Sequence, residues 1–502
     1  MRNLFKLSNR ILTKEILLKN IKEFKKKKIV LCHGAFDIVH IGHINHFKEA
    51  KKFGDILIVS LTDDSYIRKG PNQPYFKSIE RANFLLNLKL VDFIYISPTE
   101  TGEDPLTLFK PSYYVKGVDY SNQKKDINLK KEKLICKKYK TKILFTSSFK
   151  YSSTKIYNNK YANFNKEAKF FIEKILKKYT TNDILKIFDR LNDKIFCLSG
   201  EPIIDEFRFV EVIGTATKSP IVTSNLISNE LHAGGTLAAA NMLSNFVKNL
   251  KYFCPSNKSY LQNKIKLDKK IKFFSSNLDF SVPTKSRYVT KIRNNYLFQN
   301  NLIKYFNPKK SLYNNFIKSL NKHKEKHPLL ILDFGLGLFD KDLLKRKLTS
   351  KNLYLNVQSN SNNYGFNLFS KYKKYSYLSV NLKELELNFS EKFGNISKLK
   401  TISKKIGSFP ISITLGNNGS VFINKNKKFI YCPNFFPDAT DTIGCGDAYF
   451  IITSLLVSEA IDDELVPFLG NLYAGLHSKN FGNSKFPTKK ELIKTLESLL
   501  NV

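Results

Sequence analysis

The sequence of 502 residues contains no tryptophan, only two methionines, and six cysteines that never form a CxxC pair. Scattered cysteines are typical of reduced thiols, and they exclude a disulfide-stapled miniprotein and a zinc site of the usual spacing. No run of eighteen apolar residues occurs, so we expect no membrane-spanning helix and no membrane partner. The start of the chain lacks the long apolar segment and the small-residue cleavage site of a secretory signal, which predicts a cytoplasmic protein.

Acidic residues are also scarce, since 43 Asp and Glu stand against 83 Lys and Arg and leave a formal net charge of +40. Such a balance is typical of proteins that bind nucleic acid or membrane surfaces. Here the excess is spread along the chain in short runs such as 25–28, and no recognition motif accompanies it. Lys, Asn, Ile, Phe and Tyr are all abundant, which indicates biased codon usage. We therefore expect no nucleic-acid partner.

The composition, 42% hydrophobic and 25% charged, is typical of globular proteins, and the length predicts two to four domains. From residue 28 to 156, short apolar runs alternate with amphipathic stretches. The predicted strands cover 28–33, 55–62, 91–97, 112–116 and 142–147, and the predicted helices cover 43–53, 78–88 and 129–138. Strands that alternate with helices indicate a doubly wound α/β domain with a parallel sheet.

The rest of the chain divides into further stretches. Residues 1–27 are interpreted as an N-terminal extension, and the Lys- and Asn-rich residues 157–192 as a helical connector. A new strand over 194–199 opens a second α/β domain, which is predicted over 193–502. The interval 300–328, also rich in Lys and Asn, is predicted to be a surface helix of that domain.

The first candidate site is the stretch GAFDIVHIGH at 34–43, where the first strand gives way to a helix. Ligands of open parallel sheets bind at such strand ends. Glycine lets the backbone approach a phosphate, and the N–H groups that begin a helix favour an anion. The imidazoles of His40 and His43 can donate hydrogen bonds to phosphoryl oxygens. A histidine pair that merely starts a helix is the plainer alternative, and zinc is not expected because no further ligands stand at motif spacing.

This stretch resembles the signature of the cytidylyltransferase-like nucleotidyltransferases. Three more motifs similar to those of that family follow in order, at 80–81, 115–120 and 152–156. The resemblance implies that a substrate phosphate attacks the α-phosphorus of a nucleoside triphosphate and releases pyrophosphate. His40 and His43 would then stabilise the α-phosphate, and Lys116 would contact phosphate as a point charge.

The same resemblance assigns the remaining contacts of this domain. Ser153 and Thr154 would hold the triphosphate at a helix N-terminus. The other residues expected at the nucleotide are Gly34, Phe36, Asp37 and Gly42. Asp37 is expected to hold the loop or the ribose rather than to act as a base. Arg81 is either a site residue or a solvated helix residue, and it ranks below the histidines.

The second candidate site is the stretch DTIGCGDAYF at 441–450, which precedes an apolar helix. Glycines before a helix direct backbone N–H groups at one point and form an anion hole, here from Gly444, Cys445 and Gly446. The carboxylate of Asp447 could take the proton of a hydroxyl that attacks a γ-phosphate. A tight turn in which Asp447 only caps the helix is an equally simple interpretation of this stretch alone.

The stretch resembles the DTxGAGD signature of the ribokinase-like (PfkB-type) carbohydrate kinases, with Cys445 in place of the usual Ala. Other segments similar to motifs of that family follow its order over roughly 194–490. The resemblance implies that Asp447 is the base and that Asp205, Gly234 and Gly235 contact the sugar. It also places Asn381, Glu384 and Gly416 near the nucleotide and its magnesium. It implies Mg²⁺ with ATP as substrate, held through the nucleotide, with Glu384 as the one candidate side-chain ligand.

Together the two domains resemble the bifunctional enzyme of ADP-heptose synthesis. The segment 283–288 is similar to the PTxTKxR segment of that kinase, and its Lys285 and Arg287 suit a substrate that already carries phosphate. An exposed strand edge is the alternative for these two residues, because edges use such side chains to deter pairing. Some ribokinase-like kinases form homodimers through a lid strand, and no residue here decides whether this chain does.

Several departures from that enzyme indicate a divergent branch. The transferase domain precedes the kinase domain, whereas the usual order is the reverse. Asn241 lies farther from Gly235 than in the common GGAxN motif, and Leu336 stands where a Lys is expected. The segment 356–360 differs from the DPK-like strand end expected there.

The leading hypothesis is phosphorylation of a heptose 7-phosphate at the anomeric hydroxyl, followed, after a separate phosphatase step, by transfer of AMP to the sugar 1-phosphate. Only the heptose resemblance favours ATP over CTP for the transfer. The competing hypotheses are another sugar or polyol phosphate in surface glycan synthesis and a regulatory nucleotide-binding protein without turnover. The presence of Asp447 with His40 and His43 favours the enzymes.

Overall fold

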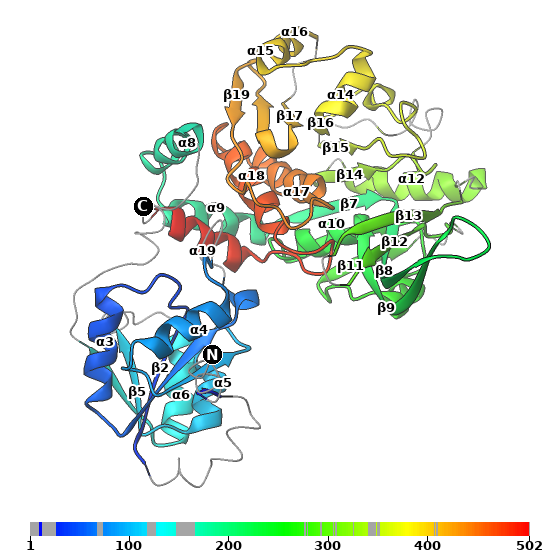
Figure 1. Cartoon of the computed structure of the whole chain (residues 1–502). Coiled ribbons are helices and arrows are strands. Elements are labelled where there is room, and N and C mark those ends of the chain that lie inside the picture. Colours follow the sequence, from blue (N-terminus) through cyan, green and yellow to red (C-terminus); the bar gives the residue numbers. More distant parts are fainter. Residues whose placement is uncertain are drawn as a thin grey trace. The chain divides into compact units, whose positions relative to one another are not determined.

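The structure is a computed structural model of the chain, which divides into two compact units, Met1–Asn163 with Lys494–Val502, and Phe164–Ile493. Figure 1 shows the elements of both. The residues that the structure describes are 10–12, 27–67, 74–117, 127–146, 166–275, 278, 280–291, 294–304, 306, 309–324, 326–339, 348, 352–405, 407 and 410–500. Within them no helix is long and apolar enough to cross a membrane.

The first unit is built on a six-stranded parallel sheet in the order β1-β4-β3-β2-β5-β6. Its strands are β1 (Ile11–Leu12), β2 (Ile29–Gly34), β3 (Ile56–Thr62), β4 (Phe93–Ser97), β5 (Tyr113–Gly117) and β6 (Lys142–Thr146). Its helices are α3 (Ile41–Lys51), η1 (Asp64–Tyr66), α4 (Ser78–Asn87), α5 (Glu103–Phe109) and α6 (Ile127–Lys138). The order reverses direction between β2 and β5, and ligands bind at such a switch point.

The predicted parallel α/β sheet of this unit is confirmed, and five of its strands lie where the apolar runs predicted them. Every residue of β3 is buried, as expected for a parallel strand covered on both faces. Three elements were not predicted, among them the short turn η1. Helix α5 is too short to show helical periodicity, and β1 pairs with β4 although it lies in the stretch interpreted as an extension.

The second unit is built on a nine-stranded sheet in the order β11-β10-β7-β14-β15-β16-β17-β18-β19. Its strands are β7 (Ile195–Gly200), β10 (Asn249–Cys254), β11 (Ile271–Ser275), β14 (Leu329–Asp333), β15 (Leu353–Val357), β16 (Tyr377–Asn381), β17 (Ile411–Thr414), β18 (Ser420–Ile423) and β19 (Phe429–Cys432). All neighbours are parallel up to β17, and the last two strands run antiparallel. A second α/β domain is thus confirmed.

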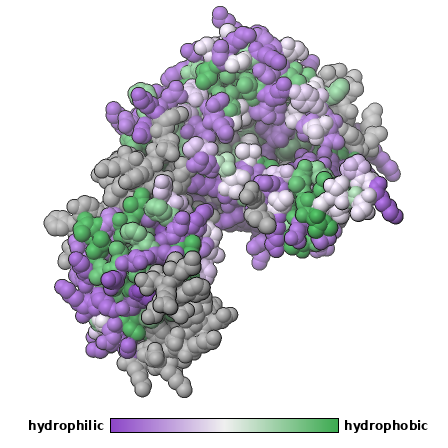
Figure 2. Space-filling model, viewed as in Figure 1, coloured by the Kyte–Doolittle hydropathy of each residue, from purple (hydrophilic) through white to green (hydrophobic). Residues whose placement is uncertain are grey.

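A four-stranded sheet, in the order β13-β12-β8-β9, belongs to the same unit, and we call it the lid sheet. Its strands are β8 (Pro202–Thr215), β9 (Val222–Gly235), β12 (Thr284–Thr290) and β13 (Tyr296–Leu302). The outer half of β8 and most of β9 are exposed, and Ile213, Val222 and Leu226 are each more than half exposed. In Figure 2, hydrophobic side chains gather over this part of the unit.

The helices of the second unit complete the layers. They are α8 (Lys166–Leu176), α9 (Thr181–Asn192), α10 (Thr236–Ser244), α11 (Lys258–Lys264), α12 (Lys310–Lys324), α14 (Leu382–Phe389), α15 (Ile396–Leu399), α16 (Ile402–Lys405), α17 (Cys445–Ser458) and α18 (Leu465–His477), with short turns η4 (Phe369–Lys371) and η5 (Gly416–Asn418). The last helix, α19 (Lys489–Leu500), begins in the second unit, and its residues from Lys494 on are counted with the first. The helix predicted over 300–328 is shorter than expected, because β13 occupies its first residues.

The stretch interpreted as a connector contains the helices α8 and α9, and both belong to the second unit. Lys174 and Lys178 on and after α8 form ion pairs of 2.7 and 2.8 Å with Glu464, which precedes α18. Phe171 of α8 stacks on Phe468 of α18 with ring centroids 6.3 Å apart. These contacts fix α8 on the helical layer formed by α18.

Candidate active sites

The first site lies at the carboxyl end of β2, at the switch point of the first sheet. Gly34 ends β2, and a Cβ on it would lie 3.2 Å from the ring of Phe36. Phe36 adopts a left-handed conformation with φ 46°, and its ring meets that of His43 edge-on at 5.2 Å. Gly42 lies in the first turn of α3. Gly34 and Phe36 therefore shape the loop that leads to the histidines.

The histidines His40 and His43 are brought together as the sequence predicted. Their rings stack with centroids 3.9 Å apart and an interplanar angle of 25°. His40 caps α3, and its backbone N–H lies 3.4 Å from Nδ1 of His43, which accepts from it. A neutral His43 then carries its proton on Nε2. Burial lowers the pKa of His40, so this ring can act as a neutral hydrogen-bond donor near pH 7.

Asp37 and Arg81 hold the backbone around this site. The carboxylate of Asp37 accepts from the backbone N–H groups of Tyr75 (2.7 Å) and Phe76 (2.9 Å). The guanidinium of Arg81 is buried and donates to Asp64 (2.7 Å) and to the carbonyl oxygens of Thr62, Phe76 and Ala35. The interpretation of Arg81 as a solvated helix residue is therefore wrong, and Asp37 holds a loop as expected.

Lys116 is the last but one residue of β5, which pairs with β2, so it lies near the same sheet edge. Its ammonium forms a buried ion pair of 2.5 Å with Glu132 of α6. The other oxygen of Glu132 accepts from the backbone N–H of Gly102 at 2.9 Å. A phosphate contact by Lys116 stays a prediction, and it would have to share the ammonium with Glu132. Ser153 and Thr154 lie outside the described residues.

Two more histidines of this unit were not singled out from the sequence. His33, on β2, makes a hydrogen bond of 3.1 Å with Ser60 of β3. His46, on the buried face of α3, makes one of 2.9 Å with Thr146 at the end of β6. Burial lowers the pKa of His46 to about 4, so this ring is neutral at pH 7. His46 lies three positions after His43, as an ordinary core residue of the helix would, so the sequence could not single it out.

The second site centres on Asp447 in the first turn of α17. Gly444 caps this helix in a left-handed conformation, φ 76°, which glycine adopts without strain. The carboxylate of Asp447 is buried, and its Oδ1 accepts from Nε2 of Gln358 at 2.5 Å. Burial raises the pKa of Asp447 to about 7, while the Gln358 hydrogen bond and the charge of Lys285 oppose the rise. Such a carboxyl group is suited to proton transfer near neutral pH.

The predicted sugar-binding residues come together beside it. Asp205 is buried on β8 and accepts from Arg287 (2.6 Å) and from Nδ2 of Asn483 (3.0 Å). A Cβ on Gly234 would collide with this carboxylate, and one on Gly235, φ 53°, would lie 2.8 Å from the carbonyl oxygen of Glu201. The glycine pair therefore leaves room for Asp205. Asn483 was not predicted, because it lies 278 positions from Asp205.

Lys285 and Arg287 lie on β12, which is paired on both sides, with β8 and with β13. The alternative that they mark an exposed strand edge is therefore wrong. Lys285 stands opposite Asp205 in the register, and burial lowers its pKa while the charges of Asp205 and Asp447 oppose the change. Arg287 is committed to Asp205, so only Lys285 directs its charge at both carboxylates.

Asp447 also lines a cavity of about 220 Å³ at the carboxyl ends of the central strands. Its lining residues are Asn356, Gln358, Ser379, Val380, Asn381, Glu384, Thr414, Thr442, Gly444, Gly446 and Asp447. Asn381 and Glu384 exchange side-chain to backbone hydrogen bonds of 2.8 Å, and burial raises the pKa of Glu384 to about 7. Gly416 is in η5, after β17, and is not in the lining.

Cys445, a predicted member of this site, and Asn241, noted only as a departure from the common glycine motif, have other contacts. The backbone N–H of Cys445 donates to the carbonyl oxygen of Thr442 (3.2 Å), and burial raises the pKa of its thiol to about 12. Asn241 accepts from the N–H of Asp268 at 2.9 Å and so fixes the turn after α11. In the described part of the chain, no group of three or more His, Cys, Asp or Glu could hold a metal ion. The carboxylate and amide oxygens of Glu384 and Asn381 fit a Mg²⁺ that arrives with a nucleotide.

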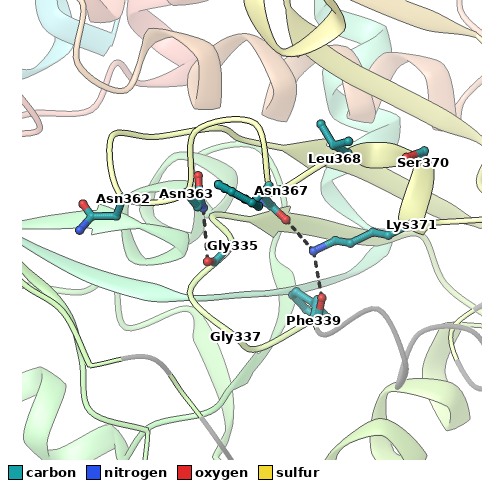
Figure 3. A pocket seen from close by; sticks show the side chains of 10 residues that line it. Gly335, Gly337, Phe339, Asn362, Asn363, Asn367, Leu368, Ser370 and Lys371 are labelled. Atoms are coloured by element: carbon teal, nitrogen blue, oxygen red, sulfur yellow. Dashed lines mark hydrogen bonds between the residues drawn. The ribbon is translucent and has the colours of Figure 1, made fainter. Parts of the chain in front are cut away.

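A second cavity of about 390 Å³ lies between the loops that follow β14 and β15 (Figure 3). Its one charged lining residue, Lys371, donates to Asp333 (2.5 Å), Asn367 (2.7 Å) and the carbonyl oxygen of Phe339 (2.9 Å). All three N–H groups of its ammonium are therefore used. Asn363 donates to Phe334 and Gly335 in the same way. These contacts fix the loops and leave no charge for an anion.

The first unit matches the sequence profile of the family described as Cytidylyltransferase-like over residues 31–159. "Bifunctional protein HldE" of Campylobacter jejuni subsp. doylei is 40% identical over 116 residues, which are 23% of this chain and 25% of that protein. The protein of the same name from Helicobacter hepaticus is 38% identical over 119 residues, with the same two shares. The chain thus matches about a quarter of the length of these curated relatives.

Two solved structures illustrate the structural comparison. A ribokinase from Thermotoga maritima has a TM-score of 0.43 and 18% identity, and the alignment covers 61% of this chain and 99% of that one. Phosphofructokinase-2 from Escherichia coli in complex with potassium has a TM-score of 0.47 and 11% identity, with the same coverage. The family match covers the part of the chain that holds His40 and His43, and it confirms that residues 31–159 are similar to cytidylyltransferase-like domains.

Proposed function

We propose that the chain is a bifunctional transferase that activates a sugar in two reactions. The second unit phosphorylates the sugar from ATP, and the first unit joins a sugar 1-phosphate to a nucleotide. The observation that supports this most is the position of Asp447, which lines one cavity with Gly444 and Gly446 and lies in the field of Lys285 and Asp205. A base, an anion-binding turn and a hydroxyl-binding carboxylate are what a phosphoryl transfer to a sugar needs.

In the kinase reaction, Asp205 accepts hydrogen bonds from sugar hydroxyls and orients the one that reacts. Asp447 takes the proton of that hydroxyl as its oxygen bonds to the γ-phosphorus, and the bond to the β-phosphate oxygen breaks to release ADP. The N–H groups of Gly444 and Gly446, which line the cavity, and the ammonium of Lys285 stabilise the charge on the transferred group. Mg²⁺ on the nucleotide offsets phosphate charge, and Asn381 and Glu384 are the residues that would receive it.

In the transferase reaction, an oxygen of the sugar phosphate bonds to the α-phosphorus of the triphosphate and pyrophosphate leaves. His40 and His43 donate hydrogen bonds to the α-phosphate as charge develops on it, and the tautomer of His43 suits Nε2 as the donor. Lys116, Ser153 and Thr154 would contact the other phosphates, as the family resemblance implies. Gly34, Phe36, Asp37 and Gly42 hold the nucleotide loop.

We propose a heptose 7-phosphate as the kinase substrate and ADP-heptose as the final product, in the cytoplasm, where nucleoside triphosphates are available. Arg287 and Lys285 would contact the sugar phosphate. Because Arg287 is paired with Asp205, another sugar or polyol phosphate is the second candidate for the kinase substrate. Only the heptose resemblance favours ATP in the transfer, so CTP is the second candidate there. The exposed apolar residues of the lid sheet suit a second copy of the chain, so we also propose a homodimer through this sheet.

The test is mass spectrometry of the full chain incubated with Mg-ATP and D-glycero-D-manno-heptose 7-phosphate. We expect a bisphosphate from the wild type and none from Asp447→Asn. After a phosphatase is added, we expect ADP-heptose, which His43→Ala should lose while it still makes the bisphosphate. If the wild type makes neither product but phosphorylates other sugars, the heptose proposal is wrong and those sugars are the substrates. The enzyme proposal is refuted if the wild type, Asp447→Asn and His43→Ala all bind ATP and the sugar phosphate equally well and none of them turns over.

A further inference from the structure

Gln358, which directly follows β15, lies between the proposed base and the central sheet. Its Nε2 donates to Oδ1 of Asp447 at 2.5 Å and to Oδ1 of Asn356 at 2.7 Å. An amide nitrogen carries two protons, so both are used. Asn356 in turn is buried on β15 and donates to the carbonyl oxygen of Ser379 on β16 at 2.9 Å. A chain of two amides thus connects the backbone of the sheet to the carboxylate of Asp447.

The backbone of Gln358 is held as firmly as its side chain. Its N–H donates to the carbonyl oxygen of Asp333 at 2.8 Å, and its carbonyl oxygen accepts from Nδ2 of Asn367 at 2.9 Å. Asn367 also bonds to Asp333, at the end of the neighbouring strand β14. The amide that reaches Asp447 is therefore fixed through its backbone and through Asn356. Because Gln358 is fixed by these other contacts, its hydrogen bond sets the orientation of the Asp447 carboxylate.

We propose that Gln358 is a positioning residue of the kinase reaction, which holds Oδ1 of Asp447 through the amide chain so that Oδ2 is the oxygen that receives the proton of the attacking hydroxyl. This inference rests on the proposed kinase function. Gln358 acts through Asp447 and itself touches no reacting atom. The sequence marked the segment 356–360 only as a departure from the expected strand end, and it could not show that Gln358 contacts Asp447, 89 positions away.

The charged groups around Asp447 explain why a neutral donor suits this position. Lys285 on β12 is the cation that acts on Asp447, whereas the carboxylate of Asp205 on β8 raises its pKa. Glu384 on α14 and the thiol of Cys445 on α17 also feel its charge. The amide of Gln358 stabilises the carboxylate of Asp447 by one hydrogen bond. A cationic donor in its place would form an ion pair with Asp447 and make it a weaker base. Asp447 stays oriented and remains basic enough to accept a proton.

The test is the pH profile of kcat for the wild type, Gln358→Met and the matched control Gln262→Met, whose glutamine is exposed on α11. Methionine keeps the length of the side chain and removes the hydrogen bond. We expect kcat of Gln358→Met at pH 7 to fall about tenfold, with KM for ATP unchanged. We expect the acid limb of its profile to move about one pH unit upward, because the lost bond favoured the charged base. Gln262→Met should match the wild type.

A second measurement gives a result even if no sugar is turned over. The melting temperature of each protein is compared with that of its Asp447→Asn counterpart from pH 4 to pH 9. In the wild type, ionisation of the buried Asp447 destabilises the fold, so this difference changes as pH rises and levels off above its pKa. In Gln358→Met we expect the levelling at a higher pH. Superimposed curves for the two pairs would overturn the inference, whereas an inactive wild type with separated curves would count against the kinase proposal alone.

Discussion

Replacement of Arg81 by methionine tests whether the backbone of the transferase site depends on a buried guanidinium. Arg81 is 1% exposed and donates to three backbone carbonyl oxygens and to Asp64. Methionine fills much of the same volume and makes none of these bonds. Removal of one partner from a buried ion pair costs about 3–5 kcal/mol, because the groups left behind lose their donors. We therefore expect a loss of about 4 kcal/mol in the unfolding free energy of the first unit.

The assay is thermal unfolding of the full chain, in which the two compact units can give separate transitions. A loss of this size lowers the melting temperature of a unit of about 150 residues by roughly 10 °C. The transition of the second unit should not move. The control is Arg190→Met, because Arg190 is exposed on α9 and its replacement should shift neither transition by more than about 1 °C. A shift of less than about 2 °C for Arg81→Met would refute the argument that these bonds hold the loop.

Four further outcomes are expected. Gly234→Ala should raise KM for the sugar at least about tenfold, measured by coupled ADP release, because its Cβ would displace the carboxylate of Asp205. Cys445→Ala should keep kcat within about twofold, and the half-buried thiol, with its pKa raised to about 12 by desolvation, should react slowly with iodoacetamide in the native chain. His46 has a pKa lowered to about 4, so it contributes stability that is lost as pH falls from about 6.5 toward 4. His46→Gln should flatten that dependence by up to about 3 kcal/mol in urea unfolding. Lys116→Met should destabilise the first unit by leaving Glu132 without its cation, whereas Lys116→Met with Glu132→Gln should recover part of the loss in the same melts.

The parts of the fold that the sequence predicted are those with local signals. Apolar runs such as β3 are buried along their whole length, and the alternation of strands with helices is enough to predict parallel sheets. The motifs 34–43 and 441–450 each stand where a strand or a glycine turn leads into a helix, so their chemistry could be read from short stretches. Residues 300–302 belong to the strand β13, so the helix predicted over 300–328 was too long at its start.

The parts that could not be predicted depend on contacts across the sheet. Gln358 bonds to a residue 89 positions away, in a segment that the sequence marked only as a departure, and Asn483 bonds to one 278 positions away and stands in no recognised motif. Lys116 looked like a free phosphate ligand because its partner Glu132 lies on a helix whose packing only the fold reveals. For Arg81 the sequence left a site residue and a solvated helix residue both open, because its carbonyl partners are known only from the fold. In each case the sequence indicated the residue type and the fold decided its neighbours.

The order of the two units along the chain has no bearing on the chemistry proposed for them. The described residues of the kinase site, from Asp205 to Asn483, all belong to the second unit, and those of the transferase site, from Gly34 to Lys116, all belong to the first. Each site is thus assembled within its own unit, the first at strand ends of one sheet and the second from the lid sheet, the strand ends of the nine-stranded sheet and the start of α17. In the proposed heptose pathway a phosphatase acts between the two reactions, so the product of one site would leave before the other used it. An enzyme under these constraints gains no advantage from having the kinase first, and the reversed order here is compatible with the same two reactions.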